Sequence, residues 1–349
     1  MEGKRLYLVP IAWIYGFVVR VRNLFFDIGI LKSYSVDVKT IVVGNICAGG
    51  SGKTPHIEYL IGLFKDQYKI STLSRGYGRK TKGFIESTED SLSTEIGDEP
   101  RQFKQKHPEL SVCVCEDRVL GVNEIMRLHP NTEIVLLDDA FQHRKLKSGF
   151  SIVLTDYYSL YTRDYLLPAG QLREPASGAK RADIIVITKT PVVISPIEKR
   201  DIIRELKLTP RQIVCFSYIN YGEFQPFHST VLPMPSKVST IFLISGIANS
   251  YPLVDHLKRK YTEVVVHDFP DHYEYKMADI EKLVSEFNRM MGKNKIILTT
   301  EKDYMRFSKP EFQEILGTLP LYYIQIDIAF HGDDALEFKK RILDYVKKD

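Results

Sequence analysis

The sequence predicts an α/β fold with a doubly wound, mostly parallel sheet, an N-terminal membrane-associated helix and a second, smaller α/β domain. From residue 37 onward, short apolar runs that end in polar residues alternate with helical patterns, which is typical of such a sheet. A glycine-rich loop joins the first of these runs to a helical pattern, and an uncharged apolar segment stands near the N-terminus.

The composition suits a protein of two domains. With 349 residues, of which 44% are hydrophobic, the chain is long enough to bury two cores. The net charge of +4 gives no reason to expect a nucleic acid as the main partner. The four cysteines do not form a metal or disulfide framework, and we expect reduced thiols in a cytosolic protein: Cys47, Cys113, Cys115 and Cys215.

The first segment, residues 1–36, is predicted to associate with a membrane. "LYLVPIAWIYGFVV" (6–19) carries no charge and has basic residues on both sides. As a helix it would be about 21 Å long, shorter than a hydrocarbon core of roughly 30 Å. Its length and its Trp13 favour a helix at the membrane interface. A buried first core helix is the alternative, and whether residues 6–26 span the bilayer or lie along it stays open.

The main sheet is expected within residues 37–225. The predicted strands include "VKTIVVGN", "KISTLS", "EIVLLDD", "FSIVLTD" and "ADIIVIT", and "TPHIEYLIGLFKDQ" is a predicted helix. Active groups in such sheets lie at the carboxyl ends of the strands. A proline-containing break near residues 226–239 precedes a second strand and helix pattern, so residues 226–349 are predicted to form a smaller C-terminal domain.

The loop "VGNICAGGSGKTP" (43–55) predicts a phosphate-binding loop between a strand and a helix. Its glycines allow the main chain to approach phosphate closely, Lys53 can reach the β- and γ-phosphates, and the Thr54 hydroxyl can bind Mg²⁺. The pattern G-x-x-x-x-G-K-[ST] requires glycine where this chain has Cys47. The predicted nucleotide-binding residues are Cys47, Ala48, Gly49, Gly50, Ser51, Gly52, Lys53 and Thr54.

The strand "IVLLDD" supports this interpretation, because it ends in two carboxylates, Asp138 and Asp139. A hydrophobic strand with terminal aspartates is the usual partner of a phosphate loop, and it binds Mg²⁺ directly or through water. We expect Thr54, Asp138 and Asp139 to form the metal site, although the sequence does not say which aspartate contacts the metal.

Two absent features narrow the class of P-loop protein. Ala48 stands where one class of ATPase carries a signature lysine, and "ITKTP" (187–191) lacks the aspartate of a guanine-specific motif.

Further polar loops offer reactive groups. Asp98 in "EIGDEP" can accept a proton from an attacking alcohol, His272 in "HDFPDHYEY" can orient or carry a proton, and Arg75 in "SRGYGRK" can bind a phosphate on the substrate.

Taken in order, these motifs resemble those of the tetraacyldisaccharide 4'-kinases of lipid A biosynthesis in Gram-negative bacteria. The strings that carry the resemblance are "VGNICAGGSGKTP", "LSRGYGR", "GDEP", "CEDR", "LLDDAFQHR", "LLPAGQLREP", "ITK", "GIAN", "FPDHYEY" and "LTTEKD". They run from the N-terminal helix to about residue 305, and "RGYGR" and "DDAFQHR" are the most specific. The sequence departs from the family at Ala140, where glycine is commoner, and at Gln171, where proline is commoner.

The resemblance implies an activity and a location. The enzyme would transfer the γ-phosphate of ATP, with Mg²⁺, to the 4'-hydroxyl of a lipid A precursor, a tetraacylated disaccharide 1-phosphate. It would act at the cytoplasmic face of the bacterial inner membrane, anchored through the N-terminal helix, and the sequence indicates no protein partner.

The resemblance also implies residue roles. Asp98 would be the catalytic base, paired with His272 when the two domains close over the substrate. Further positions of the family motifs would help to bind metal, nucleotide or lipid: Asn45, Tyr77, Arg118, Gln142, His143, Arg173 and Glu174. Two alternatives remain from the residues alone: a membrane-associated P-loop ATPase that acts as a conformational switch without a phosphoryl acceptor, and a noncatalytic nucleotide-binding scaffold.

Overall fold

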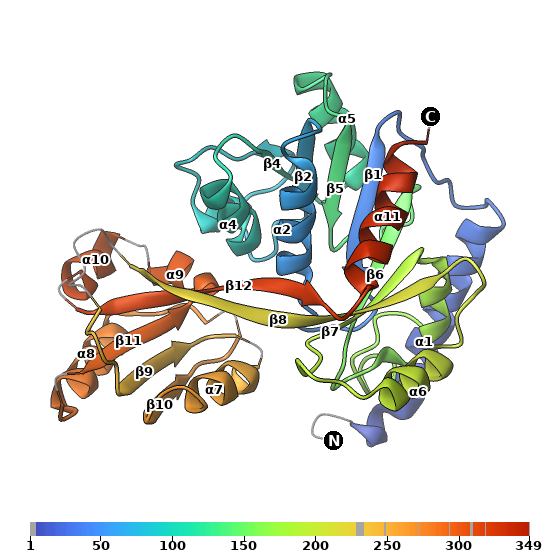
Figure 1. Cartoon of the computed structure of the whole chain (residues 1–349). Helices are drawn as coiled ribbons and strands as arrows, with labels where there is room; N and C mark the ends of the chain where they lie inside the picture. Colours follow the sequence, from blue (N-terminus) through green and yellow to red (C-terminus); the bar gives the residue numbers. More distant parts are fainter. Residues whose placement is uncertain are drawn as a thin grey trace. The chain divides into compact units, whose positions relative to one another are not determined.

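The computed structural model describes residues 5–227, 234–247, 249–271, 273–292, 294–307, 310–317 and 319–348. The chain forms two compact units (Figure 1). Unit 1 comprises Met1–Asn220 and Ile328–Asp349, and unit 2 comprises Tyr221–Asp327.

Unit 1 is built on a nearly all-parallel sheet, with strand order β8-β7-β6-β1-β5-β2-β4-β3. Only the pairing of β3 with β4 is antiparallel. In register, Ile41 of β1 lies opposite Leu136 of β5 and Phe150 of β6. The strands are β1 (Lys39–Asn45), β2 (Ile70–Ser74), β3 (Ile85–Glu86), β4 (Ser111–Val114), β5 (Ile134–Asp138), β6 (Phe150–Asp156), β7 (Ile184–Thr188) and β8 (Ile213–Pro226).

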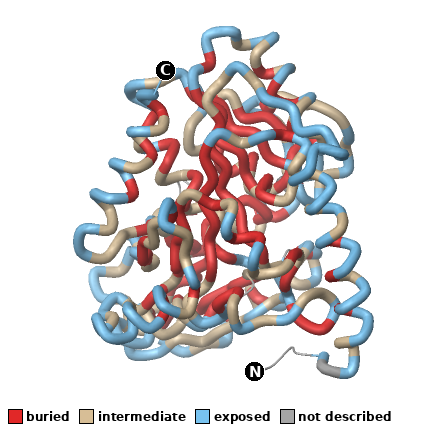
Figure 2. The backbone as a smooth tube through the Cα atoms, turned by 90° about the vertical axis from the view of Figure 1, so that its right-hand side faces the viewer, coloured by how far each residue is buried: buried red, intermediate tan, exposed pale blue. Residues whose placement is uncertain are grey.

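Helices cover both faces of this sheet, so its central strands are mostly apolar and almost fully buried (Figure 2). One face packs against α2 (Lys53–Phe64), α4 (Asp98–Lys106) and α11 (Asp334–Val346), and the other packs against α5 (Arg118–Leu128) and α6 (Pro196–Leu206). The remaining helical segments of the unit are η1 (Leu6–Leu8), α1 (Val9–Asp27), α3 (Ser93–Ile96), η2 (Tyr161–Arg163) and η3 (Ala176–Arg181).

Unit 2 has its own parallel sheet, in the order β10-β9-β11-β12. Two apolar clusters, one containing Phe242 and one containing Leu243, form its core. Its elements are β9 (Thr240–Ser245), α7 (Tyr251–Lys258), β10 (Glu263–Asp268), α8 (Met277–Arg289), β11 (Lys295–Thr300), α9 (Glu301–Phe307), α10 (Pro310–Leu316) and β12 (Leu321–Phe330). The predicted fold class, a mostly parallel α/β sheet with a smaller α/β domain, is therefore confirmed.

The C-terminal segment differs from the domain boundaries expected from the sequence. The strands β8 and β12 carry the chain from one unit to the other, and residues 328–349 belong to unit 1 rather than to a domain 226–349. The reason is the apolar face of α11, where Phe338, Ile342 and Val346 join the same core cluster as Ile41 of β1. A sequence pattern identifies such a face but not the surface that covers it.

Helix α1 also belongs to unit 1, and only a narrow face of it is buried. Ala12, Gly16 and Val19 face the protein, and a Cβ on Gly16 would lie 2.4 Å from Leu166 Cδ1. The opposite face exposes Trp13, Ile14 and Phe17, each at least 66% accessible. By length and composition α1 is the one helix in the described part of the chain that could cross a membrane.

Candidate functional site

The loop after β1 has two glycines in left-handed backbone conformations and leads directly into a helix. Gly49 and Gly52 have φ values of 113° and 84°, which side-chain-bearing residues rarely adopt, and Gly52 immediately precedes α2. Lys53 and Thr54 form the first turn of α2, whose unpaired N–H groups and dipole favour an anion. The structure therefore places the predicted cradle at the carboxyl end of β1.

Cys47 does not disturb this loop. The described residues other than glycine with positive φ are Asp139, Lys189 and Lys207, so Cys47 has a backbone conformation open to any side chain. It forms an antiparallel bridge with Leu172. On either side of Cys47, Ala48 N donates to Gln171 O (2.7 Å) and Arg173 N donates to Ile46 O (2.8 Å). Because this strap fixes the first half of the loop, glycine is not needed at position 47.

The two aspartates after β5 lie in different environments. Asp138 is buried, and within the described structure its Oδ1 has no hydrogen-bond partner. Burial raises the pKa of Asp138 to about 7, although the nearby Lys53 opposes the shift. Asp139 accepts hydrogen bonds from Arg173 Nη1 on both oxygens (2.9 and 3.1 Å) and lies 3.8 Å from Lys53 Nζ. Burial would raise the pKa of Asp139, but Lys53 and Arg173 outweigh it and the pKa is lowered.

Three predicted residues support the backbone of the site. Arg118 is buried and donates to the carbonyls of Cys115 (2.8 Å) and Asp138 (3.2 Å). His143 Nε2 accepts from Arg118 N (3.3 Å), and burial together with the Arg118 charge lowers the pKa of His143. Gln142 donates to Asn45 O (2.7 Å). In these positions the side chains fix the loops that carry Asp138 and Asp139.

Glu174 lies at the centre of a buried polar junction. It accepts from Gln142 Nε2 (2.9 Å) and from Arg181 Nη2 (2.8 Å), and its side chain is 2% exposed. Asn45 donates to Ser51 Oγ (2.9 Å), while its own Oδ1 is buried without a partner in the part of the chain that is described. An open acceptor therefore remains at Asn45, whereas the carboxylate of Glu174 is already engaged.

Helix α1 is bonded directly to this junction. Tyr15 Oη donates to Arg173 O (2.7 Å), and Asn23 Nδ2 lies 3.4 Å from Glu174 Oε2. Arg22 donates to Gln142 O (3.0 Å). The helix that exposes the apolar face is thus fixed to the two loops that carry Gln142 and Arg173.

Asp98 is the first residue of α4 and is half-buried. Gly97 precedes it with a φ of 96°, and a Cβ there would lie 3.0 Å from Tyr77 O, so the loop with Arg75 and Tyr77 packs against the start of α4. Tyr77 is 69% exposed. The charge of Glu99 contributes to the raised pKa of Asp138, and the charge of Arg75 contributes to the lowered pKa of Arg118, so each lies in the neighbourhood of that residue. His272 lies outside the described residues.

Sequence reasoning missed three residues that contact the phosphate loop. Thr188 Oγ1 donates to Ser51 O (2.9 Å), and Lys189 Nζ donates to Gly50 O and pairs with Asp156 (2.9 Å). His56 is buried, with Nδ1 2.7 Å from Gly52 O and Nε2 3.1 Å from Ser217 Oγ, and burial lowers its pKa to about 4. The polar "TKT" (188–190) at a strand end is the only sequence signal for Thr188 and Lys189, and His56 has none.

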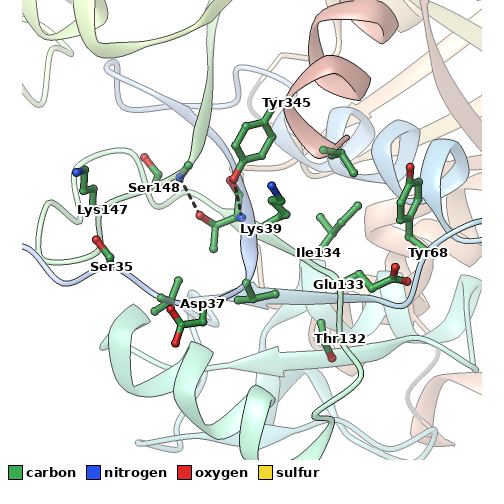
Figure 3. Close-up of a pocket in the computed structure, with 15 residues that line it drawn as sticks. Ser35, Asp37, Lys39, Tyr68, Thr132, Glu133, Ile134, Lys147, Ser148 and Tyr345 are labelled. Carbon is green, nitrogen blue, oxygen red and sulfur yellow. Dashed lines mark hydrogen bonds between the residues drawn. The ribbon is translucent and has the colours of Figure 1, made fainter. Parts of the chain in front are cut away.

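A pocket of about 620 Å³ lies at the opposite, amino edge of the sheet (Figure 3). It is lined by the start of β1, the start of β5 and the end of α11, where Tyr345 Oη accepts from Thr40 N (3.2 Å). It contains none of the predicted site residues. The predicted site therefore lies at the carboxyl edge, as expected for a parallel sheet.

Comparison with known proteins agrees with this geometry. A family model described as tetraacyldisaccharide-1-P 4'-kinase matches residues 4–347. A tetraacyldisaccharide 4'-kinase of Bacteroides thetaiotaomicron is 41% identical, over 98% of this chain and 93% of its own. One of Flavobacterium johnsoniae is 40% identical, over 100% of this chain and 99% of its own.

A solved structure is similar over the same length. The crystal structure of LpxK from Aquifex aeolicus in complex with ATP aligns with a TM-score of 0.73 at 28% identity, over 98% of this chain and 99% of the other. Because the family model covers nearly the whole chain and full-length relatives are about 40% identical to it, the chain belongs to the tetraacyldisaccharide 4'-kinase family.

Proposed function

We propose that this kinase transfers the γ-phosphate of ATP to the 4'-hydroxyl of a tetraacylated disaccharide 1-phosphate at the cytoplasmic face of the inner membrane. The family supplies the reaction class. The observation that carries the proposal is the open, buried Oδ1 of Asp138 in the same site as the Lys53 ammonium and the N-terminus of α2. A phosphate with its cation would satisfy all three groups.

The nucleotide would lie along the loop from Cys47 to Thr54. Backbone N–H groups and the start of α2 would bind the phosphate oxygens, and Lys53 would neutralise charge on the β- and γ-phosphates. Asp139 lies 3.8 Å from Lys53 and 2.9 Å from Arg173. It would therefore orient the Lys53 ammonium and the Arg173 guanidinium rather than bind phosphate itself.

The residues present fit Mg²⁺, which prefers a few oxygen ligands together with substrate phosphates and water. Among the described residues there is no cluster of three or more His, Cys, Asp or Glu side chains that could hold a metal by themselves. Thr54 and Asp138 would hold the ion, because Asp138 has the open oxygen and Asp139 is engaged by Arg173. An ion held by Thr54 and Asp138 would supply positive charge to offset the negative charge of the phosphates.

Asp98 would accept the proton of the acceptor hydroxyl. The 4'-oxygen forms a bond to the γ-phosphorus, the bond from that phosphorus to the β–γ bridging oxygen breaks, and the hydroxyl proton moves to the Asp98 carboxylate. ADP leaves with the bridging oxygen. Arg75 and Tyr77, on the loop packed against Gly97, would contact the lipid substrate, and the pairing of His272 with Asp98 stays a prediction.

The membrane surface would be met by α1. Its exposed face carries Trp13, Ile14 and Phe17, whereas Arg20 and Arg22 supply positive charge for anionic head groups. A lipid kinase must bring a soluble nucleotide site to a substrate whose acyl chains stay in the bilayer. The hydrogen bonds from α1 to the loops of Gln142 and Arg173 support this arrangement.

The test is a transfer assay with γ-labelled ATP, Mg²⁺ and detergent-dispersed disaccharide 1-phosphate lipid. We expect label in the lipid, its loss in Lys53→Ala, and in Asp98→Asn a rate lower by about 10²- to 10⁴-fold with nearly unchanged ATP binding. Asp90→Asn, an exposed aspartate in the segment before α3, is the matched control and should transfer normally.

Two outcomes would contradict the proposal. Label released as inorganic phosphate, without labelled lipid, would favour the switch ATPase. Normal transfer by Asp98→Asn would remove Asp98 as the base and leave the rest of the assignment intact.

A further inference from the structure

The carboxyl end of β7 contacts the second half of the phosphate loop. Thr188 Oγ1 donates to Ser51 O (2.9 Å), and the next residue, Lys189, donates from Nζ to Gly50 O. Two consecutive side chains therefore bind two consecutive carbonyls of the loop.

These contacts fix the orientation of two peptide groups. In a planar trans peptide the C=O and the following N–H point in opposite directions. Binding Ser51 O on the side of β7 therefore turns the Gly52 N–H away from β7, and the same holds for Gly50 O and the Ser51 N–H. In this structure the Ser51 N–H donates to Gly49 O (3.1 Å), a hydrogen bond within the loop.

The charge of Lys189 is already matched. Its Nζ lies 2.9 Å from Asp156 Oδ2 at the end of β6, and its side chain is only 16% exposed. An ammonium fixed between a carboxylate and a main-chain carbonyl is suited to orient the loop rather than to bind phosphate itself. This separates Lys189 from Lys53, whose position at the start of α2 suits direct contact.

The backbone of Lys189 is strained, which indicates that its tertiary contacts impose this conformation. Its φ is 56°, a left-handed conformation that is unfavourable for a side-chain-bearing residue and persists when the surroundings impose it. Of the other described residues with this conformation, Lys207 is the C-cap of α6, where it is common, and Asp139 bonds to Arg173 beside the loop. Strain outside helix caps is thus confined to two residues that contact Lys53, Arg173 or the loop.

We infer that Lys189 is a positioning residue for the nucleotide: with Thr188 it holds the phosphate loop in its phosphate-binding form. The inference rests on the proposed function only in taking this loop as the nucleotide site. Without the Lys189 contact, the loop would have to be ordered by ATP itself, so affinity for ATP falls while turnover at saturation changes little.

The experiment titrates the full-length enzyme with a fluorescent ATP analogue and measures KM for ATP and kcat in the transfer assay. Loss of a charge-assisted hydrogen bond in Lys189→Met should raise Kd and KM for ATP about 10- to 100-fold with kcat within about threefold. Lys189→Arg should restore most of the affinity. Lys199→Met, which removes the ion pair of Lys199 on α6 with Asp334 on α11 (3.6 Å), is the matched control and should bind ATP normally.

The readout separates positioning from general destabilisation, since misfolded enzyme lowers kcat and leaves KM unchanged. If Lys189→Met does not fold, Thr188→Val provides the same test with an expected three- to tenfold weaker binding. Unchanged Kd and KM in a folded variant would overturn the inference. If the wild type bound ATP but labelled no lipid, the proposed acceptor would fail, while the Kd comparison would still decide the role of Lys189.

Discussion

Each unit buries an aspartate at the carboxyl edge of its parallel sheet, and the two differ in what surrounds them. In unit 2, Asp303 follows β11 and is 0% exposed. It accepts from Gly246 N (2.9 Å), Thr300 Oγ1 (2.7 Å), Tyr275 Oη (3.2 Å) and Arg306 Nη1 (2.9 Å). In unit 1, Asp138 is the last residue of β5, and its buried Oδ1 accepts no hydrogen bond within the described structure.

The comparison shows how to separate structural from functional buried acids. A buried carboxylate is costly unless it is paired and hydrogen-bonded, and Asp303 meets that condition within its own unit. Asp138 does not, and its pKa is raised to about 7 mainly by burial. The open acceptor of Asp138 is available to a ligand, which is why we propose metal binding for Asp138 and a structural role for Asp303.

The largest expected effect comes from Asp303→Asn. The change leaves the Arg306 guanidinium without its carboxylate in a buried site, so the free energy of unfolding should fall by about 3–5 kcal/mol. Urea denaturation measures it. Asp255→Asn, which removes an exposed pair with Arg259, is the control and should cost less than about 0.5 kcal/mol. Equal losses of unfolding free energy in both variants would show that the buried network around Asp303 contributes no more to stability than an exposed ion pair.

The same substitution in unit 1, Asp138→Asn, should have the opposite profile. We expect transfer to fall about 10²- to 10³-fold, as for loss of one stabilising group in a transition state. Stability without nucleotide should stay equal or rise, because the neutral amide replaces a carboxyl whose charged form is disfavoured by burial. Transfer assays and thermal denaturation of the same samples test both halves. If Asp138→Asn lost as much stability as Asp303→Asn, the distinction between a functional Asp138 and a structural Asp303 would be wrong.

His56 is a buried group of unit 1 whose hydrogen-bonding capacity is fully used, and it provides a third comparison. Both ring nitrogens have partners, and burial lowers the pKa to about 4 from a usual 6.5. Because the unfolded chain binds the proton more readily, this contribution to stability is complete above pH 6.5 and is lost as the pH falls toward 4. The loss should approach roughly 3 kcal/mol. Comparing wild type with His56→Gln by denaturation from pH 7.5 to 4.5 should show a shallower slope in the variant, and identical slopes would refute it.

The smallest effect is expected for Thr300→Val. It removes one of four donors to Asp303, together with the bond that Asp303 N donates to Thr300 Oγ1 (3.1 Å). Because the Arg306, Gly246 and Tyr275 donors remain, the free energy of unfolding should fall by about 1–2 kcal/mol with transfer unchanged. Denaturation of the single variant and of a double variant with Asp303→Asn would show whether the two sites couple, and additive losses would contradict a shared network.

Much of the molecule was predictable from local patterns. The fold class was predicted correctly, because strand and helix patterns are local and the loop "GGSGKT" couples residue type to a required backbone conformation. The family and the kinase activity were predicted correctly from the resemblance of motifs such as "RGYGR" and "DDAFQHR". The exposed apolar face of α1 was also visible as an uncharged run between basic residues. The individual site roles remain predictions, and the variants of Lys53, Asp98 and Asp138 test them.

The sequence by itself determined that strands end in polar residues, and a parallel sheet necessarily gathers those ends at one edge. It did not determine which polar group at that edge would be satisfied. Asp138 and Asp139 are adjacent, yet only Asp139 meets Arg173, which lies 34 residues further along the chain. Thr188 and Lys189 reach the loop across more than 130 residues, and α11 returns to the first sheet for its apolar face. Partner choice of this kind depends on distance in the folded chain, so the tertiary structure alone decided it.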